Sequence, residues 1–185
     1  MKTTTTIYFV RHAESPYVDG QERSRCLSDK GRVDSLIVGD ILQNEEINHF
    51  VSSPYDRAIQ TIKNAAGSHD ITTFEDLRER NIGVIPENKF KESKFKVYQD
   101  FDFSFPEGES STVAQQRAIR ILMKLLSTYG GTKVVIGTHG DIMTLMMNYF
   151  DKSYDYNFWD TTTMPDIYKL DFNKTELIKV TRLWE

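Results

Sequence analysis

Short runs of β-branched and aromatic residues alternate with longer amphipathic segments along most of this 185-residue chain. The runs that predict strands lie at 7–10, 49–52, 71–74 and 133–137. The segments that predict helices lie at 28–43, 56–66, 111–129 and 142–150. Strands that alternate with helices favour parallel pairing, since each helix returns the chain to the same end of the sheet. We therefore predict a three-layer α/β/α fold, with a mostly parallel sheet between two layers of helices.

Capping and spacing signals support the first of these helices. Ser28 is a residue type that favours the N-cap position of a helix. Downstream of it, apolar side chains recur on helical spacing at Val33, Leu36, Ile37 and Ile41. This repeat predicts an amphipathic helix that runs to about residue 43.

Two further features complete the predicted organisation. Runs at 166–172 and 176–183, joined by a turn at 173–175, predict a hairpin that adds an antiparallel edge strand. Between residues 83 and 108 the composition changes, with two prolines, four lysines and five phenylalanines. The apolar residues of this stretch do not repeat with a sustained helical or strand spacing. We interpret about 84–108 as a small lid insertion. A length of 185 residues fits one domain, at roughly 100 to 200 residues per domain, so we predict a single domain of residues 1–185.

Composition and charge exclude several classes of function. The chain has 23 Lys and Arg against 27 Asp and Glu, a net charge of −4, whereas bulk nucleic-acid binding needs a basic surplus. No segment approaches the roughly 20 apolar residues of a membrane span. The apolar run at 7–10 is shorter than the core of a signal peptide, about 7 to 15 residues. One cysteine, Cys26, excludes an intramolecular disulfide and fits a reducing compartment. We expect a cytoplasmic protein with no nucleic-acid or membrane partner. The sequence does not indicate the number of subunits.

Reactive side chains follow four of the predicted strands. Arg11 and His12 follow the first, Arg57 the second, Glu79 the third and His139 the fourth. Each has an ordinary structural explanation by itself, such as a hydrogen-bonded histidine or a solvated charge. Ligands of open α/β sheets, however, bind at the carboxyl ends of the strands. We therefore expect these five side chains to share one site.

Six segments in chain order carry a pattern that belongs to a known family. They are Phe9-Val10-Arg11-His12-Ala13-Glu14-Ser15, Leu27-Ser28-Asp29-Lys30-Gly31, Ser53-Pro54-Tyr55-Asp56-Arg57-Ala58-Ile59-Gln60-Thr61, Leu77-Arg78-Glu79-Arg80-Asn81-Ile82-Gly83, Pro106-Glu107-Gly108-Glu109-Ser110 and Thr138-His139-Gly140. Together they resemble the histidine phosphatase superfamily, also called phosphoglycerate mutase-like. The resemblance implies metal-independent phosphoryl transfer, with no cofactor and with His12 as the phosphorylated residue.

Two positions depart from the family pattern. Ala13 stands where the family usually has glycine, which adds a methyl group beside the nucleophile. Val18 stands where many members have an asparagine that contacts the phosphoryl group. The first change is tolerable in size, whereas the second removes one donor.

The residue types suit phosphoryl transfer on chemical grounds as well. A phosphoryl group in transfer carries charge on three oxygens, which the planar forks of Arg11 and Arg57 match. His139, when protonated, adds a donor, and amides at the helix start near Gly140 add partial positive charge. Ser15 is a further candidate for binding the substrate. We expect these groups to form the substrate-binding set.

The nucleophile and the acid need opposite pKa shifts. His12 must be neutral to attack, and nearby arginines lower its pKa. We expect its other ring nitrogen to donate to a backbone carbonyl. Glu79 would protonate the leaving alkoxide and then take a proton from water, so it needs a raised pKa, which desolvation by the lid supplies. Glu109 and Asp19 are the alternative carboxylates.

Other signals are weaker. The spacing of Cys26 and Arg32 matches the loop of cysteine-dependent phosphatases, but residues 20–25 are too polar for the strand that should precede it. Asp100 and Asp102 resemble the paired aspartates of magnesium-dependent phosphotransferases but also lack a preceding strand. The lysines of the lid suit an anionic, partly apolar substrate, but a solvated face of an irregular segment is the favoured explanation. The scattered histidines give little support to a metal site.

The sequence thus favours a phosphatase that acts on a small phosphomonoester. A phosphoglycerate mutase is the second hypothesis, although mutases of the family tend to be longer and to have a more basic insertion. A non-catalytic module that binds a phosphorylated ligand is the third. The sequence leaves the physiological substrate open.

Overall fold

The computed structural model describes residues 3–185 and places six strands in one mixed sheet. The strands are β1 (Thr4–Arg11), β2 (His49–Ser52), β3 (Ile71–Thr73), β4 (Lys133–Thr138), β5 (Asp166–Asn173) and β6 (Glu176–Arg182). Their order across the sheet is β3-β2-β4-β1-β5-β6. The first four are parallel, and β5 is antiparallel to both of its neighbours. The predicted α/β class, with a mostly parallel sheet and an antiparallel edge, is confirmed.

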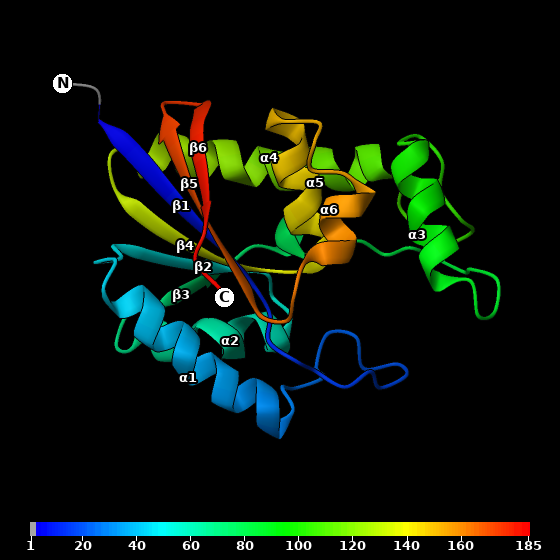
Figure 1. Cartoon of the computed structure of the whole chain (residues 1–185), viewed down its shortest axis with the longest axis horizontal. Helices are drawn as coiled ribbons and strands as arrows, with labels where there is room; N and C mark the ends of the chain where they lie inside the picture. Colours follow the sequence, from blue (N-terminus) through cyan, green and yellow to red (C-terminus); the bar gives the residue numbers. More distant parts are fainter. Residues whose placement is uncertain (1–2) are drawn as a thin grey trace.

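Helices cover both faces of the sheet (Figure 1). One layer consists of α1 (Asp29–Gln43) and α2 (Asp56–Ala66), and the other contains α4 (Ser111–Thr128) and α5 (Gly140–Phe150). Along β1, Ile7 and Phe9 belong to the core on the α4 and α5 side, whereas Tyr8 and Val10 belong to the core on the other side. Successive side chains of a strand point to opposite faces. A strand covered on both faces must therefore be apolar throughout, as this one is.

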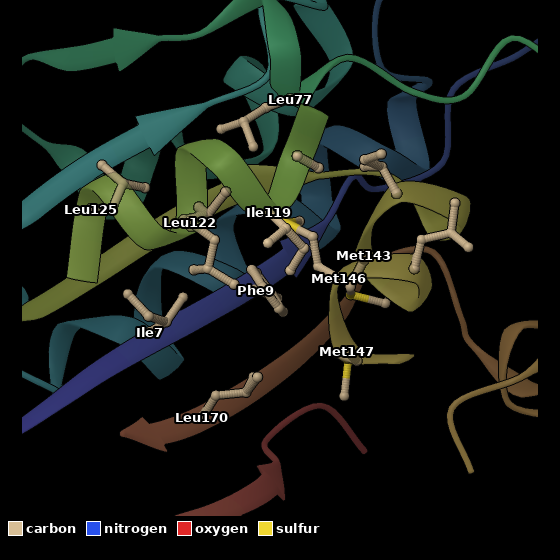
Figure 2. Close-up of a cluster of buried hydrophobic side chains, with 14 of the residues drawn as sticks. Ile7, Phe9, Leu77, Ile119, Leu122, Leu125, Met143, Met146, Met147 and Leu170 are labelled. Carbon is tan, nitrogen blue, oxygen red and sulfur yellow. The ribbon is translucent and has the colours of Figure 1, made fainter. Parts of the chain in front are cut away.

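The larger core fixes the position of α5. Figure 2 shows Ile7 and Phe9 of β1 near Leu122 of α4, with Met143 and Met146 of α5 beside them. All five side chains are fully buried. Burial of side chains of this size contributes about 1.5 to 3 kcal/mol each. This packing holds the first turn of α5 against the carboxyl end of the sheet, where the reactive residues lie.

The α1 helix buries a different face from the one that its apolar repeat indicates. Ser28 is the N-cap as predicted, and its hydroxyl accepts from the Gly31 amide at 3.0 Å. Val33, Leu36 and Ile37, however, are 59%, 56% and 44% exposed. The buried residues are Gly31, Asp34, Ser35, Val38 and Leu42. Small and polar side chains allow α1 to lie close to α2, where Asn64 donates to the Ser35 hydroxyl at 3.1 Å.

The two ends of the segment at 84–108, the predicted lid, lie side by side. Gly83 has φ of +84°, and a Cβ there would lie 2.3 Å from the Pro106 oxygen. The Val84 amide donates to the same oxygen at 2.8 Å, so the two ends of the segment are joined. Within it lies α3 (Phe90–Gln99), a helix that the sequence patterns did not predict.

A second helix missing from the predictions, α6 (Tyr156–Thr161), packs beside α3 (Figure 1). The rings of Phe95 and Tyr156 meet edge to face, with 5.2 Å between their centroids. Both helices are short, and short helices depend on tertiary packing more than on propensity. A 3-10 turn at Glu75–Leu77 completes the described elements.

Within residues 3–185, every helix is too short or too polar to cross a lipid bilayer. Residues 1 and 2, which begin the stretch considered for a signal peptide, lie outside the described residues.

Candidate active site

The carboxyl ends of β1, β2 and β4 meet beside a cavity of about 830 Å³. Of the five side chains expected to share a site, Arg11, His12, Arg57 and Glu79 line this cavity. The fifth, His139, does not line it but lies behind the lining, fully buried, with its ring centroid 5.3 Å from that of His12. The fold thus brings the predicted set together, with one histidine beneath the surface of the cavity.

His12 has one ring nitrogen held by the backbone. Its Nδ1 lies 2.8 Å from the carbonyl oxygen of Ala13. Because a carbonyl can only accept, Nδ1 carries the proton and Nε2 keeps its lone pair. Burial, and then the charge of Arg57, hold the pKa of His12 well below its usual value of 6.5. The ring is therefore neutral, as a nucleophile must be.

Arg11 extends from the last position of β1. Its Nη1 donates to the backbone oxygen and the hydroxyl of Thr162, at 3.1 and 2.6 Å. Its Nε is buried and has no partner. The guanidinium packs on Gly140, where a Cβ would lie 2.9 Å from Cζ. Gly140 therefore makes room for Arg11 and is absent from the cavity lining, and its role in binding substrate stays a prediction.

Arg57, in the first turn of α2, is 1% exposed. Its Nη1 donates to the backbone oxygen of Glu22 and its Nη2 to the carboxylate of Glu22, both at 2.5 Å. The guanidinium also lies over the ring of Tyr55, 5.0 Å from its centroid. Its Nε is buried without a partner. An exposed loop glutamate that the sequence analysis did not identify thus contacts the fork expected to bind phosphate.

His139 is the N-cap residue of α5 and contacts Ser53, with 2.7 Å between Nε2 and the hydroxyl oxygen. Its Nδ1 is buried without a partner. Burial first, and then Arg57, hold the pKa of His139 well below 6.5. A neutral ring is therefore favoured, in place of the protonated donor considered from the sequence.

Glu79 lies against the start of α5. Its Oε1 accepts from the amides of Arg80 and Ile142, at 2.8 and 2.9 Å, and its Oε2 accepts from the amide of Asp141 at 3.1 Å. The amides of Asp141 and Ile142 at this helix start thus bind Glu79, and a contribution of the helix start to phosphoryl binding stays a prediction. Burial and the charge of Asp141 raise the pKa of Glu79 above 4.5, against the opposing effect of Lys94. Oε2 has a single donor and keeps a position for a proton.

A buried ionic cluster joins the lid to this acid. Asp141 accepts from Arg80 Nε at 3.1 Å, from the Tyr98 hydroxyl at 2.9 Å and from Lys94. Burial acts to raise the pKa of Asp141, but Lys94 and Arg80 outweigh it and hold the pKa well below its usual value. Asp141 therefore stays charged, next to the Glu79 carboxylate. Lys94 and Tyr98 belong to α3, so the cluster ties the lid helix to the start of α5.

Arg25 is a cationic residue of the cavity that the sequence analysis missed. Its Nη1 donates to the backbone oxygen of Ser15 at 2.6 Å, and its Nε lies 3.4 Å from the Glu22 carboxylate. Its charge contributes to the low pKa of His12. The sequence feature that could have indicated it is the pair Arg23 and Arg25, two cations in the loop that follows the first strand. Ser15 itself lines the cavity, and its hydroxyl donates to the Cys26 oxygen at 2.8 Å.

The alternative residues lie elsewhere. Neither Glu109 nor Asp19 lines the cavity. Glu109 pairs with Arg117 at 2.7 Å, and Asp19 accepts from the hydroxyl of Tyr17. Cys26 is exposed in the loop between β1 and α1, and no strand lies directly before it. Within the part of the chain that the structure describes, no three His, Cys, Asp or Glu side chains form a group that would hold a metal ion.

The two departures from the family pattern have different settings. Ala13 is fully buried, and its amide donates to the Thr61 hydroxyl at 2.9 Å, so the extra methyl group is accommodated. Val18 lines the cavity and is 39% exposed, so an apolar side chain stands at the entrance.

Solved structures with the same fold include both phosphatases and mutases. The mycobacterial glucosyl-3-phosphoglycerate phosphatase has a TM-score of 0.75 at 16% identity and covers 98% of both chains. A mutant phosphoserine phosphatase from Entamoeba histolytica in complex with phosphoserine has a TM-score of 0.77 at 15% identity, covering 97% of this chain and 96% of that chain. At these identities the likeness establishes the fold alone.

Sequence comparison is more specific. A probable phosphoglycerate mutase GpmB of Yersinia pestis (strain Pestoides F) is 31% identical over 150 residues, covering 72% of this chain and 69% of the relative. The family model for the histidine phosphatase superfamily (branch 1) matches residues 7–180. That match spans all six motifs and every side chain placed in the cavity from β1 to α5. The chain therefore belongs to the histidine phosphatase superfamily.

Proposed function

We propose that this protein is a metal-independent phosphatase that hydrolyses a small phosphomonoester through a phosphohistidine on His12. The observation that carries the proposal is the state of His12, a neutral ring with a free Nε2 lone pair at a cavity that Arg11, Arg57 and Glu79 also line. A neutral imidazole among guanidinium groups is suited to attack an anionic phosphorus centre. We further propose that the protein is cytoplasmic, which the free thiol of Cys26 fits.

In the first step, Nε2 of His12 attacks phosphorus as the bond from phosphorus to the ester oxygen breaks. Glu79, in its protonated form, transfers its proton to that oxygen, so the alcohol leaves neutral. The raised pKa of Glu79 supports this role. The products of this step are phosphohistidine, a free alcohol and a Glu79 carboxylate.

In the second step, water attacks the phosphohistidine and Glu79 takes a proton from it. The bond from phosphorus to Nε2 breaks, inorganic phosphate leaves, and neutral His12 and protonated Glu79 are restored. In both steps Arg11 and Arg57 balance the charge on the phosphoryl oxygens. Each has a buried Nε without a partner, which would gain one from a phosphoryl oxygen. In this proposal Ser15 and His139 support the same oxygens from the loop and from beneath.

A mutase is the second candidate, because the curated relative that shares 31% identity is named a probable phosphoglycerate mutase. A mutase would pass the phosphoryl group of His12 to a second alcohol and not to water. The chemistry at His12 would be the same, so the two candidates differ only in the acceptor.

Turnover of p-nitrophenyl phosphate with a chelator present tests the proposal. The wild type and Cys26→Ser should be active, and His12→Ala should lose activity by at least about 10³-fold. Full activity in His12→Ala would overturn the phosphohistidine mechanism. Absence of turnover of any phosphomonoester would favour a binding module instead. Product analysis with 3-phosphoglycerate and a bisphosphoglycerate primer separates the mutase, which would release the isomer in place of inorganic phosphate.

A further inference from the structure

The part of the cavity formed by the lid, α6 and the loop after α6 is largely apolar. We call this surface the lid-side wall, and it consists of Phe90, Lys94, Trp159 and Met164. The ring centroids of Phe90 and Trp159 are 6.2 Å apart, and Lys94 Nζ lies 5.3 and 5.5 Å from them. Phe90 is 51% exposed and Met164 is 44% exposed. Exposed apolar side chains that gather at a cavity indicate a binding surface.

Two chains of contacts connect the lid-side wall with the reacting groups. On one side, Arg11 donates to Thr162, and the Thr162 hydroxyl donates to the Trp159 oxygen at 2.7 Å. On the other side, Lys94 contacts Asp141, whose amide donates to Glu79. The wall is therefore tied both to an arginine of the phosphoryl site and to the acid that protonates the leaving group. A leaving group that meets Glu79 lies beside this wall.

Two buried cations beside the wall, Lys94 and Arg80, both pair with the buried Asp141. The pairs of Arg78 with Glu109 at 3.3 Å and of Arg23 with Glu75 at 2.8 Å are more exposed and lie outside the wall. Lys94 and Asp141 are buried, so their charges balance each other within the protein. A carboxylate or a second phosphate on the leaving group would have to compete with these partners. Among the described residues, this end of the cavity thus offers aromatic surface in place of free positive charge.

We propose that the natural substrate is a phosphomonoester whose leaving group is uncharged and carries an aryl or arylalkyl portion that Phe90 and Trp159 contact. This inference rests on the proposed phosphatase function and specifies its substrate class. Offset or edge-to-face contact between aromatic rings adds to the gain from burying apolar surface. The same wall disfavours a phosphoglycerate, whose leaving group carries a carboxylate.

Esters of primary alcohols separate recognition from intrinsic reactivity, because all of their leaving groups are alkoxides. Benzyl phosphate should have a kcat/KM about tenfold or more above that of methyl phosphate and of 3-phosphoglycerate. Trp159→Ala should reduce the ratio of benzyl to methyl turnover by about tenfold, and Phe90→Ala by a smaller factor. Tyr149→Ala is the matched control, since Tyr149 is an aromatic residue of α5 that is 48% exposed and does not line the cavity. It should leave the ratio unchanged.

A binding measurement keeps the test independent of turnover. Calorimetric titration with benzylphosphonate and methylphosphonate, which are not hydrolysed, should give tighter binding of the benzyl compound to the wild type. Trp159→Phe should keep this preference and Trp159→Ala should lose it. Equal affinity for the two phosphonates, or a preference for 3-phosphoglycerate in turnover, would overturn the inference while leaving the phosphatase intact. Loss of all turnover with the benzyl preference retained in binding would instead refute the proposed reaction.

Discussion

The two ends of the cavity balance their positive charges in different ways. At the phosphoryl end, defined by Arg11, His12 and Arg57, the counterion of Arg57 is Glu22, whose side chain is 49% exposed on a loop. At the lid-side wall, the counterion of Lys94 is Asp141, which is fully buried. An exposed carboxylate can move into water when a ligand arrives, whereas a buried one cannot leave without a large desolvation penalty for its partner. The positive charge of Arg57 is thus available to substrate at the phosphoryl end, whereas that of Lys94 is neutralised by a buried partner at the lid-side wall.

The difference shows why a count of basic residues is a poor guide to a phosphate site. The cavity is lined by several arginines and a lysine, yet the ones near the lid serve the structure of the protein. What distinguishes Arg11 and Arg57 is that neither has a buried carboxylate partner, since Arg57 pairs with the exposed Glu22 and Arg11 donates to Thr162. Four predictions test this distinction.

The largest effect is expected at the phosphoryl end. Arg57→Ala should lower kcat/KM for every phosphomonoester on the order of 10³-fold, because it removes a fixed donor that stabilises charge in the transition state. Arg32→Ala is the control, since Arg32 pairs with Asp29 on the surface. Steady-state kinetics measures both, and a loss under tenfold in Arg57→Ala would show that the fork does not contact the phosphoryl group.

At the lid-side wall, substitution should affect stability. Asp141→Asn leaves Lys94 and Arg80 buried without a counterion, so the free energy of unfolding should fall by about 3 kcal/mol in urea titration. The folded protein holds the pKa of Asp141 below its unfolded value of about 3.9. Its stabilising contribution is therefore complete above that pH and is lost as pH falls through the folded pKa.

The difference between wild type and Asp141→Asn should accordingly shrink in acid. Asp29→Asn, at a side chain that is 99% exposed, is the control and should change stability little at any pH. Equal stability of wild type and Asp141→Asn at pH 7 would mean that the buried cluster does not hold the lid in place.

Glu79→Gln should show an effect that depends on the leaving group. An alkoxide needs a proton, so turnover of methyl phosphate should fall about 10²-fold, whereas p-nitrophenyl phosphate should lose much less. The raised pKa of Glu79 should also place the basic limb of the kcat/KM profile above the usual range of a glutamate, since activity is lost as the acid loses its proton. Glu109→Gln tests the alternative carboxylate and should show no dependence on the leaving group.

The smallest effect is expected from the movable counterion. Glu22→Gln keeps a side chain that can accept from Arg57 but removes the charge that competes with phosphate. Inhibition by inorganic phosphate or vanadate should become about threefold to fivefold tighter, the scale of an exposed ion pair. Glu176→Gln, on an exposed position of β6, should leave the inhibition constant unchanged. Weaker inhibition in Glu22→Gln would show that Glu22 positions Arg57 and does not compete with the ligand.

Much of the site was predictable because it follows directly from strand ends. Arg11 and His12 come immediately after a run whose apolar continuity predicts a strand, and Arg57 lies shortly after another. Parallel strands with helical crossovers have their carboxyl ends at one edge, so neighbours in the sheet bring these residues together. The Nδ1 contact of His12 with a backbone carbonyl was expected on the same local grounds.

Other features depended on contacts between distant parts of the chain. The apolar repeat of α1 indicated Val33 and Leu36 as buried, yet packing against α2 selected the face with Ser35. Glu22 contacts Arg57, 35 positions later, and Lys94 contacts Asp141, 47 positions later. No local pattern distinguishes these carboxylates from solvated ones.

Alternation and capping are local properties of each segment, so the α/β layers and the residues at the carboxyl edge of the sheet could be predicted without coordinates. Contacts between distant segments, in contrast, set which charges remain available to a ligand. Lys94 and Arg57 are both buried cations of the cavity lining, but Lys94 pairs with a buried aspartate and Arg57 pairs with an exposed glutamate. Whether a charge serves the substrate or the fold depends on the burial of its partner, which is set by the packing of α3, α5 and the loop before α1.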